Sequence, residues 1–233
     1  MNRAALLAGA GGIIIGGLAM LVAGGSLGAD PGRAEVEGIV RDYILANPDI
    51  IPEAMQRLQT REVAKVVDAN REALETPFGS AWAGNPRGDV VLVEFFDYAC
   101  GFCRKSNADV DRLLQEDKNL KVVWREWPVL GQDSLAAAEA SLAAAKQGKF
   151  DRYFKALFEQ GRPTPPAIAA AGNAAQVTAL VSPDLQREIE KNYQLARTIG
   201  ASGTPAFVVG DKVLQGAVGY DALKEAIAEA RRS

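Results

Sequence analysis

Two cysteines three residues apart are the side chains of this chain with the clearest chemical potential. The motif Cys100-Gly101-Phe102-Cys103 contains the only cysteines in a sequence of 233 residues. The apolar run at 90–96 predicts a buried strand before the motif, and residues 104–115 have a helical pattern. Thiols on the first turn of a helix lie side by side and can close a small disulfide. Free helix N–H groups stabilise a thiolate on the first of them, so the motif predicts thiol chemistry.

Glu94 interrupts the apolar strand six residues before Cys100. A carboxyl group buried beneath the dithiol would have a raised pKa and could relay a proton as Cys103 attacks or leaves a mixed disulfide. The alternative is that Glu94 points to a solvated edge of the sheet or pairs with a lysine.

A second feature lies far along the chain, where Gly203-Thr204-Pro205 directly precedes an apolar strand at 206–209. A proline at this place indicates a cis peptide in a tight turn, and an ordinary trans turn is the alternative. The exposed backbone of such a turn can pair with an extended client chain beside the thiol.

Competing uses of the two thiols fit the sequence less well. Structural zinc needs four ligands, usually Cys or His, whereas this chain has two cysteines and no histidine. A zinc or copper site would need carboxylates or a second subunit, and an iron–sulfur cluster fails on the same count. A structural disulfide gains most when it closes a long loop, and this one closes almost none. We therefore expect no metal and no cofactor.

The composition limits the other partners. A formal net charge of −3, a sequence pI near 5.2 and the lack of a basic run interleaved with aromatic residues argue against a nucleic-acid partner. An apolar content of 48% over this length is enough for one domain with a full core and an appendage.

The N-terminus has the pattern of an export signal. A short basic start ending at Arg3 is followed by the uncharged, largely apolar stretch 4–29, so we expect residues 1–29 to be a signal peptide or a membrane anchor. A buried core helix is the alternative. Export would place everything after Asp30 outside the cytoplasm.

The remaining chain divides into two regions. Residues 30–76 read as helices whose apolar faces either fold back on the core or, over 33–75, meet copies of themselves. A Gly- and Pro-rich stretch then leads into a domain at 77–233. Its predicted order is strand, helix, strand (121–127), a helical region, the strands 206–209 and 212–215, and a last helix at 220–231. This is an α/β thioredoxin fold with an inserted helical domain at about 131–200, where a Pro- and Ala-rich linker separates the helix at 150–160 from one beginning near Ser182.

Three segments together resemble the DsbA-like family of exported thiol–disulfide oxidoreductases, over roughly residues 88–232. They are Phe95 to Cys103, Trp127-Pro128-Val129-Leu130-Gly131 and Gly203 to Phe207. The resemblance implies that Cys100 is the exposed nucleophile, Cys103 the resolving thiol and Glu94 the buried acid. Thr204 and Pro205 would form the cis-proline loop, and they would bind substrate together with Gly101 and Phe102.

Gly101 and Phe102 stand where DsbA itself has Pro-His, so we expect a less oxidising couple than that of DsbA. The N-terminal helices resemble the oligomerising stalks of suppressor-of-copper-sensitivity and isomerase-type relatives. The sequence thus predicts a periplasmic enzyme, which residues 4–29 would hold at the inner membrane if they are not cleaved. It would act on client proteins with cysteines or disulfides, be recycled by a membrane redox partner, and form a homo-oligomer.

The sequence leaves the direction of the reaction open between disulfide formation, reduction and isomerisation. A thiolate module for copper or zinc, or a chaperone-like protein with an inert disulfide, are the rival functions. The aromatic residues Phe102, Trp124 and Trp127 either line a client groove or belong to the core.

Overall fold

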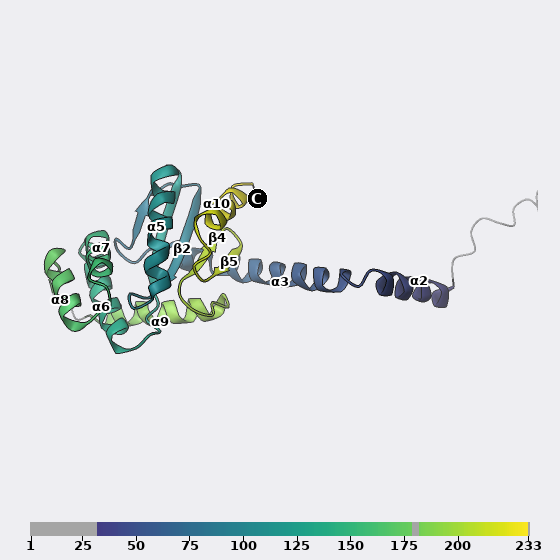
Figure 1. Cartoon of the computed structure of the whole chain (residues 1–233), viewed down its shortest axis with the longest axis horizontal. Coiled ribbons are helices and arrows are strands. Elements are labelled where there is room, and N and C mark those ends of the chain that lie inside the picture. The colour runs from purple at the N-terminus through teal and green to yellow at the C-terminus, as the bar shows by residue number, and fades with distance from the viewer. Residues whose placement is uncertain (1–31, 179–181, 233) are drawn as a thin grey trace, which may run out of the picture. The chain divides into compact units, whose positions relative to one another are not determined.

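A computed structural model describes residues 32–178 and 182–232 of the chain (Figure 1). The expected signal peptide or anchor at 1–29 lies outside these residues. Within the described ranges no helix is long and apolar enough to cross a membrane. The chain divides into two compact units, Met1–Gln56 and Arg57–Ser233, which we describe separately.

A five-stranded mixed sheet forms the centre of the second unit, in the order β1-β3-β2-β4-β5. β2 and β3 are parallel and the other neighbours are antiparallel. The strands are β1 (Trp82–Gly84), β2 (Val90–Phe96), β3 (Leu120–Glu126), β4 (Ala206–Val209) and β5 (Lys212–Gln215). The expected strands are thus confirmed. β1 lies in the Gly- and Pro-rich stretch where no strand was expected, because three residues are too few to show a period.

Helices cover both faces of this sheet. Successive side chains of a strand point to opposite faces, so alternate residues of β2 pack against different helices. Leu92 and Phe96 pack in the cluster that includes residues of α5 (Gly101–Glu116) and α10 (Tyr220–Ala230). Val93 and Phe95 pack on the other face, in a cluster with residues of α3, α4 and α9. Glu94 shares the face of Leu92 and Phe96, which is the face that α5 covers (Figure 1).

Four helices form the insertion between β3 and β4: α6 (Gln132–Lys146), α7 (Phe150–Gln160), α8 (Pro165–Ala174) and α9 (Pro183–Thr198). The first three are grouped together in Figure 1. The expected Pro- and Ala-rich linker is wrong, because α8 lies there. The Thr164 hydroxyl accepts the N–H of Ala167, and Pro165 occupies the first turn, where its missing N–H costs nothing.

The N-terminal region forms α2 (Arg33–Ala46), α3 (Ile50–Ala69) and α4 (Arg71–Glu75). The expected packing onto the core applies to part of it. Val67 and Leu74 are buried in the cluster on the second face of the sheet, so residues near them do fold onto the core. Large apolar side chains nearer the N-terminus are exposed instead: Val36, Ile39, Val40, Tyr43, Leu45, Ile51, Met55 and Leu58.

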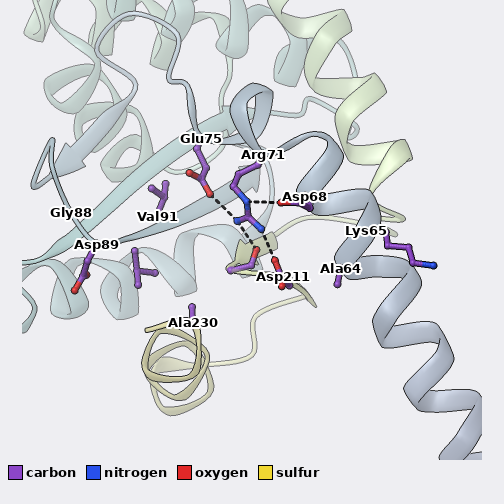
Figure 2. Close-up of a pocket in the computed structure, with 12 residues that line it drawn as sticks. Ala64, Lys65, Asp68, Arg71, Glu75, Gly88, Asp89, Val91, Asp211 and Ala230 are labelled. Atoms are coloured by element: carbon purple, nitrogen blue, oxygen red, sulfur yellow. Dashed lines mark hydrogen bonds and ion pairs between the residues drawn. The ribbon is translucent and has the colours of Figure 1, made fainter. Parts of the chain in front are cut away.

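Two arginines fix α4 to the rest of the second unit. Arg125 of β3, only 1% exposed, donates to the carbonyls of Leu74 and Thr76 and forms an ion pair with Glu188 of α9 at 3.0 Å. Arg71 reaches the β4–β5 turn, where it contacts Asp211 at 2.5 Å. This second contact lies in a cavity of about 630 Å³. Figure 2 draws the residues that line it. Since the cavity lies where β2 begins and β4 ends, it is at the opposite end of the sheet from the dithiol.

Candidate active site

The dithiol lies at the start of α5, just after the end of β2. Cys100 is the N-cap of α5, and its Sγ atom accepts the backbone N–H of Cys103 at 3.4 Å. Hydrogen bonding from the Cys103 thiol is the main cause that lowers the pKa of Cys100 to about 5, against the opposing effect of burial. Thr204 and the backbone N–H groups of Phe102 and Cys103 lower it further. Cys100 is therefore a thiolate at neutral pH in the reduced protein.

The two thiols differ in their surroundings. The side chain of Cys100 is 5% exposed and that of Cys103 is fully buried. Burial is the main cause that raises the pKa of Cys103 far above its usual range. The expectation of an exposed Cys100 is wrong in degree, because its sulfur lies against the turn that precedes β4. Cys100 is nevertheless the more accessible thiol, and it is the ionised one.

The peptide bond between Thr204 and Pro205 is cis, as expected from the sequence. As a thiol, Cys100 donates to the carbonyl of Thr204 at 3.2 Å. The antiparallel pairing of β2 with β4, in which Phe95 lies opposite Ala206, brings these distant segments together. Thr204 is half-buried, whereas Gly101 and Phe102 are exposed beside the thiol. All four residues expected to bind substrate thus lie next to Cys100, two of them directly after it in the sequence and two in the turn against its sulfur.

Glu94 is fully buried on the side of the sheet that α5 covers. Burial raises the pKa of Glu94 to about 8, and the negative charges of Cys100 and Asp111 add to this effect. Its Oε2 accepts a hydrogen bond from the indole Nε1 of Trp124 at 3.0 Å, which acts in the opposite direction. The expectation of a buried carboxyl group is confirmed, and the solvated edge or lysine pair is wrong. The sequence did not predict Trp124 as the partner of Glu94. Their contact depends on the register of β2 against β3, which places these two residues opposite each other.

Asp97 supports the loop that leads to Cys100, a role that the sequence analysis did not foresee. It is 2% exposed, and its carboxylate accepts the backbone N–H groups of Ala99, Val129 and Leu130 at 2.8 to 2.9 Å. The sequence signal for this role was an acidic residue directly after a buried strand. Through these bonds the loop before Cys100 is tied to the segment 127–131.

The insertion also contacts the active-site loop through buried polar groups. The hydroxyl of Tyr98 lies 2.8 Å from Ser141 Oγ of α6, and Ser141 donates to Glu126 Oε1 at 2.8 Å. Burial raises the pKa of Glu126 to about 7. The chain of bonds therefore runs from the insertion to a residue two positions before Cys100.

The aromatic residues separate into two groups. Phe102 is 66% exposed and adjoins Cys100, while Trp124 and Trp127 are buried in the core. Among the described residues, no three Cys, Asp or Glu side chains gather in an arrangement that could hold a metal ion.

Comparison with known families agrees with this geometry. A family model described as DSBA-like thioredoxin domain matches residues 91–228. This chain belongs to that family. Its members are thiol–disulfide oxidoreductases, and residues 91–228 contain the dithiol, Glu94 and the cis-proline loop. A second family model, described as the Copper resistance protein ScsC N-terminal domain, matches residues 33–65.

Individual relatives give the same picture. Disulfide bond formation protein D from Bacillus subtilis is 27% identical over 168 residues, which cover 64% of this chain and 76% of that protein. A thioredoxin-like oxidoreductase from Silicibacter pomeroyi is 36% identical with a TM-score of 0.67, covering 70% of this chain and 99% of that one. A linker-deletion mutant of Proteus mirabilis ScsC is 28% identical with a TM-score of 0.69, covering 88% and 98%. The chain also matches a Na(+)/H(+) antiporter from Salinispora arenicola, but over only 24% of that protein's length.

Proposed function

We propose that this DsbA-like protein is an exported enzyme that exchanges disulfides with client proteins, with Cys100 as nucleophile and Cys103 as resolving thiol. One observation carries the proposal. The Cys100 sulfur caps α5 and lies 3.2 Å from the carbonyl that precedes cis Pro205. The sulfur with the lowered pKa thus lies beside backbone that can hold an extended client chain.

The reaction follows from the two different thiols. The Cys100 thiolate attacks one sulfur of a client disulfide, the client S–S bond breaks, and the other client sulfur leaves as a thiolate. Cys103 then loses its proton and attacks Cys100 Sγ, which releases the client's second thiolate and closes the Cys100–Cys103 disulfide. The client is reduced by two electrons and the enzyme is oxidised by two. If the client's own thiol attacks instead, the enzyme leaves reduced and the client disulfide has been moved.

Single-cysteine variants test the roles of the two thiols. With a peptide that contains one disulfide as substrate, Cys103→Ser should accumulate a mixed disulfide through Cys100, since the resolving thiol is missing. Cys100→Ser should form none, because the buried Cys103 is protonated. Equal trapping by both variants would refute the assignment. Zinc or copper that co-purifies with the wild type and is lost in Cys100→Ser, without any redox turnover, would favour the metal-binding rival.

We infer that isomerisation is the main direction and that the N-terminal helices support it by forming a homo-oligomer. Except for Leu45, the exposed apolar side chains of α2 and early α3 recur at spacings of three and four within each helix, as in helices that pack against one another. Several dithiols on one oligomer could act on one misfolded client. Wild type should restore activity to scrambled ribonuclease, whereas a form starting at Arg57 should be monomeric and slower in this assay. The same number of subunits per particle in both forms would refute assembly through the N-terminal helices.

Export to the periplasm and recycling by a membrane redox partner complete the proposal. Cell fractionation checks the location, since export predicts full-length or processed protein outside the cytoplasm. The redox state of Cys100 and Cys103 in intact cells checks recycling, because an isomerase kept active by a reducing partner is found in the dithiol form.

A further inference from the structure

The two oxygens of the buried Glu94 carboxyl group have different environments. Oε2 accepts the indole N–H of Trp124 at 3.0 Å, while Oε1 is buried with no hydrogen-bond partner among the described residues. An indole N–H only donates, so Oε2 must act as acceptor in every protonation state. The carbonyl-type oxygen of a carboxylic acid is its better acceptor. When Glu94 is protonated, its proton therefore belongs on Oε1.

The indole is itself held in place by the insertion. Trp124 is 5% exposed, and its ring packs against Phe150 and Phe154 of α7 with centroids 5.6 and 5.2 Å apart. Phe154 also contacts Phe96 at the end of β2. On its backbone side, the Trp124 N–H donates to the carbonyl of Ala81. A ring fixed on several sides cannot turn its N–H away from Glu94, so the insertion determines which carboxyl oxygen is engaged.

We propose that Trp124 is a positioning residue for disulfide exchange, which keeps the exchangeable proton of Glu94 on the oxygen left free to serve Cys103. This inference rests on the proposed function. As Cys103 attacks Cys100 Sγ in the mixed disulfide, its thiol proton passes to Oε1 of the ionised Glu94 carboxylate, the Cys100–Cys103 bond forms and the client thiolate leaves. In the reverse direction Cys103 leaves the disulfide as a thiolate and takes the proton from Oε1.

The charged and titratable groups around Glu94 permit a clean test. Cys100, Cys103 and Asp111 of α5 interact with it electrostatically, and Trp124 is the neighbour that donates to it. In the mixed disulfide Cys100 is bonded and does not titrate. The pH dependence of the resolving step then reports on Cys103 and Glu94, and an Asp111→Asn variant shows how much the exposed carboxylate contributes.

Stopped-flow reaction of the reduced full chain with an aromatic disulfide such as dithionitrobenzoate separates the two steps. The first release of nitrothiobenzoate reports attack by Cys100, and the second reports attack by Cys103. Trp124→Phe keeps the aromatic packing but removes the N–H that stabilises the Glu94 carboxylate. The pH midpoint of the second release should therefore rise by about 1 unit, while that of the first stays unchanged.

Three further variants make the result decisive. Trp82→Phe is the matched control on β1 and should leave both midpoints in place. Glu94→Gln should remove the titration from the second release. Benzothienylalanine at position 124 replaces the N–H by sulfur without changing the ring shape, and it should reproduce Trp124→Phe even if that variant folds poorly. An unchanged second midpoint in the sulfur analogue would overturn the inference. Absence of a first release from wild type would instead overturn the proposed function.

Discussion

Acidification of the reduced protein gives the sharpest test of the active-site electrostatics. The structure lowers the pKa of Cys100 to about 5 and keeps Cys103 protonated. Between about pH 5 and pH 7, forming the reduced site from the disulfide should therefore take up two electrons and one proton. Below pH 5 it should take up two protons. The potential should fall by about 30 mV per pH unit in the upper range and by about 59 mV per unit in the lower range.

The same pKa sets the potential at pH 7. A thiolate stabilises the reduced form, and each unit of pKa below the ambient pH is worth about 30 mV for a two-electron couple. Scaling from thioredoxin, with a cysteine pKa of about 7 and a potential of about −270 mV, gives about −220 mV. Scaling from DsbA, at about 3.5 and about −120 mV, gives about −165 mV. We expect a value between these two.

Equilibration with dithiothreitol or glutathione mixtures from pH 4 to pH 7 measures both quantities. Acid quenching, alkylation and mass spectrometry then give the fraction of Cys100–Cys103 disulfide. A potential near −120 mV would refute the reasoning, because it would require stabilisation of the thiolate that this site lacks without a histidine. A slope near 59 mV per unit between pH 6 and pH 7 would also refute it, since Cys100 would then be protonated.

Three further outcomes concern stability, measured by denaturant unfolding of the reduced protein. Because folding lowers the pKa of Cys100, the stability that its thiolate contributes is complete above the unfolded pKa of about 9 and is lost as pH falls through about 5. Between pH 7 and pH 4 the free energy of unfolding of wild type should fall by about 3 kcal/mol more than that of Cys100→Ser. Equal losses in the two proteins would contradict the thiolate. The raised pKa of Glu94 has the opposite effect, because stability is lost as pH rises from about 4.5 to about 8. Glu94→Gln should therefore gain about 3 kcal/mol of stability relative to wild type between pH 4 and pH 7, and a constant difference would show that folding does not shift the pKa of Glu94. Arg125→Met should cost about 3 to 5 kcal/mol because it leaves the buried Glu188 with only the weaker ion pair to Lys191 at 3.9 Å. Adding Glu188→Leu should recover part of that loss, and no recovery would assign the cost to the lost hydrogen bonds to the carbonyls near Leu74 instead.

Most of the fold was predictable because its signals are local. Apolar runs identify β2, β3 and β4, and the helical spacing of apolar residues identifies the helix after the cysteines. β1 was missed because it has only three residues and exists through its pairing with β3. α8 was missed because its Pro and Ala content was read as a linker, although Thr164-Pro165 is a helix-start signal. Whether residues 30–76 fold onto the core was decided by packing for the part near Val67 and Leu74, which are buried, whereas self-association of the exposed part stays a prediction.

The sequence by itself determined the chemistry of Cys100 and Cys103, because it depends on contacts between residues at most three positions apart at the start of one helix. Only the tertiary structure decided what surrounds them. Thr204 is 104 residues from Cys100 and reaches it through the pairing of β4 with β2. Trp124 meets Glu94 only in one register of two parallel strands. A shift of one residue in that register would turn the indole to the other face of the sheet, so no local pattern could specify the contact.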